Sequence, residues 1–510
     1  MQHYDLIIIG TGAGGGTIAR KLAPTGKKIL ILERGGYIPR EKENWDTREV
    51  FLNARYKAKE EWSDKNGKAF HPGIHYAVGG NTKVYGAALL RMRESDFGEV
   101  RHHGGISPAW DIKYEDLAPW YLEAENLYSV HGLRGSDPTE PHETAPYKLA
   151  PLPHEPAIGR LFSKLEKSGL KPFPLPVGFR SENDQNGSPV TLDRFDGFPD
   201  PTESKADAHV AGINEALKYP NVTLQINSYV ERLVTGEDGK EVKSVDVIHN
   251  GENISYSADI VIVSAGAINS AALLLRSAND KHPNGLANGS DVVGRHYMAH
   301  NNSAMVALST KLNPTKFGKT FAINDFYYGD DEFKYPMGHI QMLGKSDALM
   351  FKEDAPFFTP DFVLEIMANH ALDFWMTSED LPLPENRVTL DKNRNISISY
   401  TDNNLEGHKR LQKKLRSILD NLDGGLKILP KNIYLGKRIP IAGTAHQCGT
   451  IRFGSDPEKS ALDTWCRAHE VSNLYVVDGS FFPSSSAVNP ALTIMAMALR
   501  VGDHLIEKLK

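Results

Sequence analysis

The chain has 510 residues, of which 40% are hydrophobic and 24% charged, and its formal net charge is −6. This length predicts two or three domains whose cores need no disulfide or metal. The charge gives no reason to expect nucleic acid as a partner, and two cysteines make no disulfide framework. The mean hydropathy of −0.39 argues against a membrane span. A strand pattern that starts at Tyr4 leaves no room for a signal peptide, so we expect a cytoplasmic protein.

The N-terminus is predicted to form a β–α–β unit. Residues 4–9 are an apolar run ended by glycines, which is typical of a buried parallel strand. Residues 17–22 have helical spacing, and residues 28–32 form a second apolar run. Residues 10–15 between strand and helix fit G-x-G-x-x-G, whose glycines permit a tight turn and the approach of a pyrophosphate to the helix N-terminus.

Glu33 ends the second predicted strand, 18 residues after Gly15 (33 − 15). Its carboxylate can accept hydrogen bonds from ribose hydroxyls and would repel a 2′-phosphate, which disfavours NADP. A glycine motif alone is weak, but with both strands and the terminal acid it predicts dinucleotide binding. It does not distinguish FAD from NAD.

The middle of the chain contains a long polar segment over residues 37–75, with little periodicity. Segments of this length are usually lids or clamps, and a gate over the site and an oligomer contact both remain open. Further buried strands are predicted at residues 222–226 and 260–264. The second ends in Ala265-Gly266-Ala267, a turn that brings the backbone close to a ligand.

Alternating apolar and polar residues predict an antiparallel sheet between residues 301 and 401. Its strands are expected at residues 303–308, 338–343, 362–367, 387–390 and 396–400. We therefore predict an α/β protein in which a second, α+β domain (residues 301–435) is inserted into a Rossmann-like domain (residues 1–300 and 436–510). The last part is expected to hold a strand at 474–477 and a helix at 491–509.

Further short motifs follow the N-terminal unit in a fixed order. They are Glu33-Arg34-Gly35-Gly36, the glycine-rich residues 78–87 with Arg91 and Asp96-Phe97, residues 265–270, residues 293–300, His446-Gln447-Cys448-Gly449-Thr450, Asp478-Gly479-Ser480 and Asn489-Pro490-Ala491-Leu492-Thr493. Together they resemble the glucose–methanol–choline (GMC) family of flavin oxidoreductases over nearly the whole chain. The resemblance implies an FAD-binding domain, a substrate-binding domain and oxidation of a CH–OH group. Residues 382–390 and the ending at residues 489–493 are more similar to the sugar-oxidising members, namely the pyranose oxidases and the gluconate- or fructose-type dehydrogenases. This similarity favours a sugar or glycoside as substrate.

The resemblance also implies which residues contact FAD. They are Gly10, Gly12, Ala13, Gly15, Glu33, Arg34, Gly79, Gly80, Asn81, Thr82, Tyr85, Gly86, Val230, Ala265, Gly266, Asp478, Gly479, Pro490 and Thr493. Asp478 as a plain helix cap and Val230 as a core valine are competing interpretations. Members with covalent flavin carry a histidine at the place of Val84, and valine cannot form that bond, so noncovalent FAD is expected.

Two residues are predicted to perform the chemistry. Oxidation of an alcohol removes a hydroxyl proton and a hydride, and FAD takes the hydride. His446 follows small residues and precedes a Gly-Thr turn, so its ring can reach a cleft, and histidine suits proton acceptance near neutral pH. Asn489 can donate to the substrate oxygen or accept from its hydroxyl. The alternatives are a structural histidine and a turn residue before Pro490.

Other substrates and roles stay open from the sequence. The same chemistry fits a polyol, a sterol, choline or an aromatic alcohol, whereas the presence of both His446 and Asn489 disfavours a noncatalytic flavin-binding protein. The electron acceptor can be oxygen, a quinone or a redox protein. Phe374-Trp375 with Asn369-His370 can line a sugar pocket or form ordinary sheet core. The histidines show no metal spacing, and no metal site is predicted.

Overall fold

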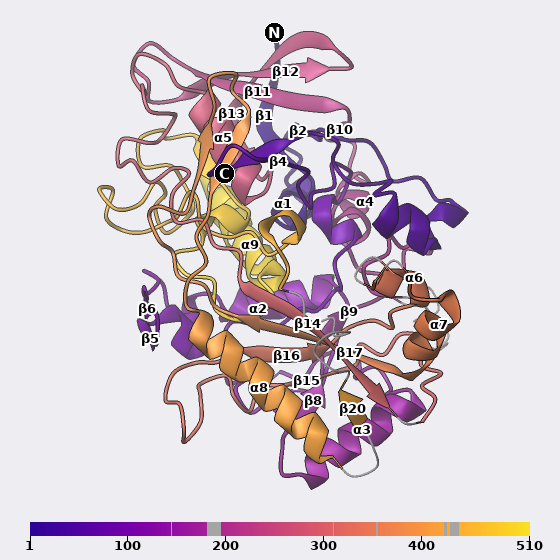
Figure 1. The fold of residues 1–510 in the computed structure, drawn as a ribbon. Helices are drawn as coiled ribbons and strands as arrows, with labels where there is room; N and C mark the ends of the chain where they lie inside the picture. The colour runs from indigo at the N-terminus through magenta and orange to yellow at the C-terminus, as the bar shows by residue number, and fades with distance from the viewer. Residues whose placement is uncertain are drawn as a thin grey trace.

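The fold is described from a computed structural model. It covers residues 1–143, 145–180, 195–309, 311–352, 355–356, 358–422, 426–428 and 438–510. Two large sheets organise the chain, one containing β1 and β13 and the other containing β14 and β17, and in Figure 1 helix α9 (Ala491–Lys508) stands between them. Within the described residues, no helix is long and apolar enough to cross a membrane.

The first sheet has seven strands in the order β10-β2-β1-β13-β12-β11, with β21 paired to β13. Its strands are β1 (Gln2–Ile9), β2 (Ile29–Leu32), β10 (Val222–Gln225), β11 (Ser228–Thr235), β12 (Val242–His249), β13 (Glu252–Val263) and β21 (Leu474–Val476). β1, β2, β10, β13 and β21 are parallel, and β11 and β12 extend the sheet as antiparallel strands. Within the apolar runs predicted at residues 4–9 and 28–32, residues 6–9 and 29–32 are buried, as parallel strands covered on both faces require.

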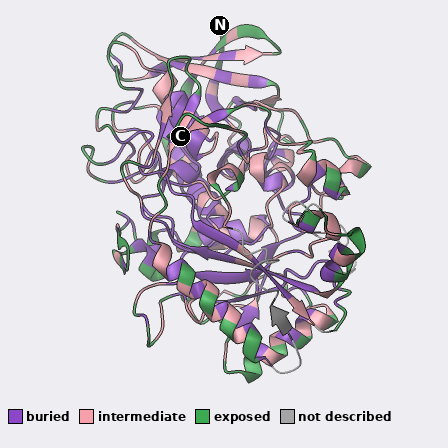
Figure 2. Cartoon of the chain, in the orientation of Figure 1, coloured by how far each residue is buried: buried purple, intermediate pink, exposed green. Residues whose placement is uncertain are grey.

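The second sheet has six strands in the order β20-β14-β17-β16-β15-β8, and its neighbours pair antiparallel. The strands are β8 (Pro172–Pro174), β14 (Asn301–Ser309), β15 (Phe321–Ile323), β16 (His339–Met342), β17 (Ala371–Ser378) and β20 (Leu426–Ile428). Helices α3 (Pro156–Lys167) and α8 (Leu405–Asn421) share an apolar core with this sheet. Figure 2 shows the second sheet and the centre of the first sheet buried, and exposed residues on the outer sides of these helices. The predicted fold class, α/β with an antiparallel second sheet, is confirmed.

One predicted strand is wrong. Residues 362–367 lie in helix α7 (Asp361–His370). Its buried residues Leu364, Met367 and Ala368 follow helical spacing, but Phe362 and Ile366 on the other side are 63% and 56% exposed. Apolar residues on both sides of the helix hide its period in the sequence.

Two further predicted strands form, but in another sheet. β18 (Arg387–Leu390) and β19 (Ile396–Ser399) pair with β3 (Trp62–Asp64) and β4 (Ala69–Phe70) in a four-stranded sheet. β3 and β4 belong to the predicted lid over residues 37–75. The lid is therefore held by strands that come more than three hundred residues later in the chain.

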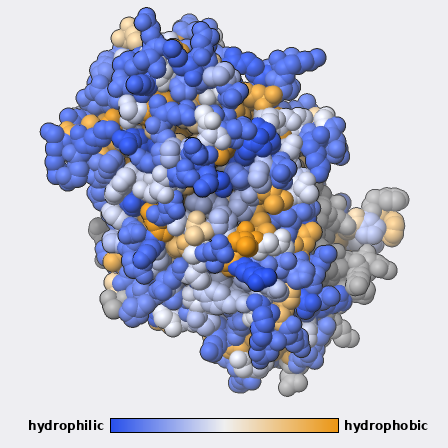
Figure 3. Space-filling model, turned by 90° about the vertical axis from the view of Figure 1, so that its left-hand side faces the viewer, coloured by the Kyte–Doolittle hydropathy of each residue, from blue (hydrophilic) through white to orange (hydrophobic). Residues whose placement is uncertain are grey.

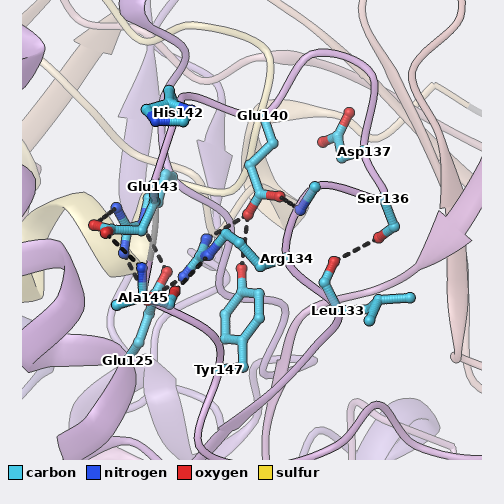
Figure 4. Close-up of polar contacts among 12 residues, drawn as sticks. Glu125, Leu133, Arg134, Ser136, Asp137, Glu140, His142, Glu143, Ala145 and Tyr147 are labelled. Carbon is cyan, nitrogen blue, oxygen red and sulfur yellow. Dashed lines mark hydrogen bonds and ion pairs between the residues drawn. The ribbon is translucent and has the colours of Figure 1, made fainter.

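A charged network fixes the segment after α2 (Ala118–Leu127). Figure 4 shows Arg134 between Glu125 and Glu140, with Tyr147 beside it. Arg134 Nη2 donates to Glu125 Oε2 at 2.7 Å, and its guanidinium lies 3.9 Å from the centre of the Tyr147 ring. Arg91 donates to the same Glu125 carboxylate through Nε and Nη2, each at 2.7 Å. Each charged group has an oppositely charged partner, so we assign this network a role in stabilising the fold.

Candidate active site

One large cavity is lined by residues of both sheets, and its volume is about 510 Å³. Ile9, Leu32 and Val230 line it from the first sheet, and Gln341 and Trp375 line it from the second. All the predicted site residues line this cavity except three: Gly15, Gly79 and Thr493. This volume lies within the range of pockets that bind small molecules and cofactors.

Three helix N-termini meet at the cavity. The first residues of α1 (Ala13–Leu22), α5 (Ala267–Arg276) and α9, which are Ala13, Ala267 and Ala491, all line it. None of the three helices has an acidic residue in its first turn. Unpaired amides and helix dipoles at these ends favour a bound anion such as a pyrophosphate.

The glycine turn before α1 leaves no room for side chains. Gly10 has a φ of 101°, and a Cβ at Gly14 would lie 1.8 Å from the carbonyl oxygen of Val477. The second glycine-rich segment packs on this turn, because a Cβ at Gly80 would lie 3.3 Å from Gly12 Cα. The backbone can therefore approach a ligand closely on both sides.

Glu33 lies at the end of β2, as predicted, and is 6% exposed. Its Oε2 accepts from Thr11 Oγ1 at 2.5 Å, and its Oε1 accepts from the Gly35 amide at 2.9 Å. Burial raises the pKa of this carboxyl group. Each carboxylate oxygen keeps further acceptor capacity for a ribose hydroxyl at the cavity wall.

The predicted lid reaches the cavity beside Glu33. Glu60 of this segment accepts from Arg34 Nη2 at 2.5 Å and from Tyr76 Oη. The Arg34 guanidinium lies between the rings of Tyr76 and Tyr229, at 4.0 Å and 4.7 Å from their centres. Arg34 and Tyr76, which Glu60 contacts, line the cavity together with Tyr229, so this segment packs on residues of the cavity wall.

The glycine-rich segment after the lid is held by its own hydrogen bonds. Asn81 Oδ1 accepts from the His75 amide at 2.9 Å, and Tyr85 Oη donates to the carbonyl of Ala206 at 2.6 Å. Thr82 Oγ1 accepts from the Ala208 amide at 2.9 Å. These bonds fix the wall that Asn81, Thr82 and Tyr85 present to the cavity.

Asp478 is a helix cap and Val230 is a core residue, as the competing interpretations have it, and both residues also lie at the cavity. Asp478 Oδ1 accepts from the Ser480 amide, as a cap does, and Oδ2 accepts from the Gly266 amide, both at 2.9 Å. Val230 is 6% exposed and belongs to the main core. Both residues also line the cavity, beside Ala265, Gly266, Gly479 and Pro490.

Three predicted contact residues lie behind the cavity wall. A Cβ at Gly15 would lie 2.0 Å from the Gly10 carbonyl oxygen, so this glycine serves the turn. Gly79 donates its amide to Thr11 Oγ1 at 3.0 Å, and Thr493 Oγ1 lies 2.7 Å from Tyr121 Oη. Their contact with a cofactor stays a prediction.

His446 and Asn489 meet at the cavity, although 43 residues (489 − 446) separate them in the chain. Asn489 Nδ2 donates to His446 Nε2 at 3.2 Å, and both residues are part-buried. His446 Nδ1 lies 3.1 Å from Nδ1 of a second histidine, His300. The Nε2 atom of His300 lies 3.2 Å from the carbonyl oxygen of Ser485.

These contacts determine where the ring protons sit. A carbonyl oxygen only accepts, so His300 carries its proton on Nε2, and Nδ1 of the neutral ring is an acceptor. His446 must then donate from Nδ1, which leaves a lone pair on His446 Nε2. Burial holds the pKa of His446 well below 6.5 and also lowers the pKa of His300. His446 is therefore neutral at pH 7 and ready to accept a proton at Nε2.

Several cavity residues escaped the sequence analysis. His300, which contacts His446, ends the motif at residues 293–300, to which the sequence analysis gave no role, and the lining residues Lys319, Gln341 and Asp196 carry no local motif. Of the proposed aromatic pair, Trp375 lines the cavity and Phe374 belongs to the core, while His370 Nδ1 lies 2.8 Å from the Ser309 carbonyl, away from the cavity wall. In the described ranges, no cluster of three or more metal-ligating side chains occurs.

Comparison with known proteins matches the chain to one family. Residues 4–302 match the N-terminal part of GMC oxidoreductases and residues 382–498 match the C-terminal part. The chain is 28% identical to 2-methyl-1,2-propanediol dehydrogenase of Mycolicibacterium austroafricanum, over 99% of this chain and 95% of that protein. It is 27% identical to the fructose dehydrogenase large subunit of Gluconobacter japonicus, over 99% and 98%. Pyridoxine 4-oxidase of Mesorbium loti has the same fold, with a TM-score of 0.66 at 18% identity over 98% of this chain and 99% of that one.

A dinucleotide cradle and a histidine–asparagine pair that share one cavity define an oxidoreductase of the flavoprotein class. The chain belongs to the GMC oxidoreductase family. It is accordingly an FAD-dependent enzyme that acts on CH–OH groups of an alcohol-type substrate. The cavity fits FAD, because it joins the anion-binding helix ends, the buried Glu33 and the His446–Asn489 pair.

Proposed function

We propose that this enzyme oxidises a CH–OH carbon of a sugar or another polyhydroxylated alcohol to a carbonyl, with His446 as the proton acceptor and Asn489 as its partner. The observation that carries the proposal is the lone pair on His446 Nε2, set by the contacts to His300 and Asn489. A neutral imidazole whose Nε2 lone pair faces the cavity is the group that a hydroxyl proton requires, and the substrate hydroxyl takes the place of the Asn489 N–H at that lone pair.

Bound FAD supplies the hydride acceptor for this chemistry. Asn489 Nδ2 holds the substrate oxygen while His446 Nε2 takes the hydroxyl proton. Asn489 Oδ1 is buried and has no partner in the described chain, so it can accept a hydrogen bond from the substrate. The positive charge that forms on His446 is stabilised at Nδ1, where His300 accepts a charge-assisted hydrogen bond.

The substrate class is supported by the cavity and by the relatives. Propanediol and fructose, which the two relatives are named for, both carry several hydroxyl groups. Besides the His446–Asn489 pair, the cavity lining includes two polar side chains, Gln341 and Lys319, and the aromatic ring of Trp375. Gln341 and Trp375 lie on strands of the second sheet, and Lys319 lies just before one of its strands. Aromatic faces pack on the C–H surfaces of sugars, and the polar groups serve hydroxyls.

FAD is proposed to be held without a covalent bond. Val84 lines the cavity where covalent relatives carry a histidine, and its side chain offers no atom for such a bond. Acid precipitation of the holoenzyme tests this: the flavin should remain in the supernatant, and flavin that stays with the pellet would contradict it. Oxygen, a quinone and a redox protein are the proposed acceptors, and mixing the reduced enzyme with each in turn separates them.

The reaction itself is tested by anaerobic mixing of the holoenzyme with a panel of sugars, polyols, simple and aromatic alcohols, choline and sterols. Absorbance of the oxidised flavin should bleach with at least one polyhydroxylated member, and the bleaching should be lost in His446→Ala. Bleaching by aromatic alcohols, choline or sterols alone would refute the substrate class. A flavin that no alcohol reduces would refute the function.

A further inference from the structure

The six-stranded sheet has two buried faces of opposite character. Ile340 and Met342 of β16 point to the apolar core shared with α3 and α8, as do Phe374 and Met376 of β17. The residues between them point the other way, since side chains alternate along a strand. On that face Gln341 is directly opposite Trp375 in the register, and both line the cavity.

Polar atoms on this cavity face lack partners. Gln341 is 2% exposed and its Oε1 meets no donor in the described chain. His339, two residues earlier on β16, cannot supply one. Its Nδ1 donates to Asn324 Oδ1 at 2.7 Å, so its Nε2, also without a partner there, is an acceptor. Buried acceptors without donors cost free energy, and a ligand hydroxyl would satisfy them.

A buried ion pair completes the same wall. Lys319 precedes β15, is 3% exposed and donates to Asp196 Oδ2. Asp196 Oδ1 accepts from the Gly344 amide at 3.0 Å. An ammonium has three N–H donors, and in the described ranges Asp196 is the acceptor that Lys319 Nζ reaches. A Cβ at Gly86 would lie 1.9 Å from Lys319 Nζ, so the ion pair rests against the glycine-rich wall of the FAD domain.

We propose that Lys319, Asp196 and Gln341 form a subsite for a second hydroxyl group of the substrate, apart from the hydroxyl that is oxidised. The hydroxyl accepts from Lys319 and donates to Asp196 or to Gln341 Oε1, and Trp375 packs against the C–H face beside it. Because Asp196 balances Lys319, the subsite selects neutral polyhydroxylated substrates over acids and amines. This inference rests on the proposed oxidation of CH–OH groups at His446.

A purely structural ion pair is the competing explanation. It accounts for the contact between Lys319 and Asp196, but not for the unpartnered Gln341 Oε1 on the same cavity wall. It also predicts no effect of either group on the choice between substrates. Substrate discrimination therefore separates the two explanations.

The test compares two variants of the FAD-loaded enzyme with the wild type. Gln341→Met keeps the shape of the side chain and removes its acceptor. The double variant Lys319→Gln with Asp196→Asn removes both charges together, so that neither is left buried and unpaired. Leu343→Val is the matched control, since Leu343 lines the cavity two residues further along and has no polar atom. FAD content and melting temperature are recorded for each.

The readout is kcat/KM for flavin reduction with propan-1-ol, propane-1,2-diol, glycerol, glucose and fructose, and with the deoxy analogues of the two sugars. The wild type should prefer the substrate with the extra hydroxyl by about tenfold to a hundredfold. Gln341→Met and the double variant should each lose most of this preference while the rate with the analogue that lacks the hydroxyl is kept. Leu343→Val should change the rates of each pair equally.

Three results would overturn the inference. A wild-type enzyme that reduces its flavin equally well with both members of each pair refutes the subsite and leaves CH–OH oxidation standing. An unchanged preference in folded, FAD-loaded Gln341→Met refutes it as well, even if the double variant fails to fold. A flavin that none of the alcohols reduces refutes the proposed function and the subsite together.

Discussion

Replacement of His300 tests whether its hydrogen bond supports proton transfer. His300→Leu removes the acceptor at 3.1 Å from His446 Nδ1. A hydrogen bond to a charged group contributes about 1.5–3 kcal/mol, and the charge on His446 exists only after it takes the proton. The rate constant for flavin reduction should therefore fall by about 10- to 150-fold, with little change in substrate affinity. Stopped-flow mixing without oxygen measures both quantities.

His300→Asn is the matched variant. The φ of His300 is 57°, a conformation that asparagine tolerates and leucine adopts at a cost. The asparagine Oδ1 can also take the place of Nδ1 as acceptor for His446. This variant should lose less than about tenfold in rate. If His300→Leu binds FAD and reduces it at the wild-type rate, or if both variants lose the same factor, the hydrogen bond does not support the transfer.

Three further outcomes follow from the buried groups. The flavin-reduction rate should be constant at and above pH 6.5 and fall only at lower pH, because burial lowers the pKa of His446, and an acid limb above pH 6.5 in stopped-flow data would contradict this. Burial lowers the pKa of His408 to about 3, so as the pH falls below 6.5 the unfolded chain binds one more proton than the folded chain, and the free energy of unfolding falls by about 1.4 kcal/mol per pH unit. His408→Gln should remove this contribution from the pH dependence of the free energy measured by urea unfolding. The same pH dependence in the variant and the wild type would exclude it. Glu60→Gln should weaken FAD retention by about tenfold, since it loses the charge-assisted bond to Arg34. If equilibrium dialysis gives the variant and the wild type the same FAD affinity, the Glu60–Arg34 contact does not help to retain FAD.

The fold was predictable where local patterns and topology agree. Residues 6–9 and 29–32 are buried on both faces, so their unbroken apolar runs identify them as parallel strands. Residues 387–390 form the predicted strand and pair with β19, which in turn pairs with β3 of the segment 37–75. No local sequence pattern predicts a pairing between strands more than three hundred residues apart. In α7, apolar residues on the exposed side removed the helical period.

The site was predictable where a motif is contiguous. The turn at residues 10–15 and the pair His446 and Asn489 sit in short motifs, and the structure brings both to one cavity. Lys319 and Asp196 line the same cavity from separate segments and carry no local motif, and His300 acts there only through its contact with His446. Their value lies in tertiary contacts, which no residue spacing within one segment can show.

The polar residues of β16 and β17 mark the binding site by their burial. In the sequence, His339, Gln341 and Thr377 look like the solvent face of an antiparallel sheet. In the structure all three are 2% exposed or less, because the FAD domain lies across that face. Polar residues are common on the outer surface, since the face in Figure 3 is mostly hydrophilic, with small separate hydrophobic groups. A sheet buried on both faces is expected to be apolar on both. Thr377 Oγ1 donates to the Ala487 carbonyl at 2.5 Å, but Gln341 Oε1 and His339 Nε2 have no partner within the described chain, and such buried acceptors need partners from elsewhere. Hydroxyl groups of a bound substrate are such partners, which ties the specificity of the enzyme to the inner face of its second sheet.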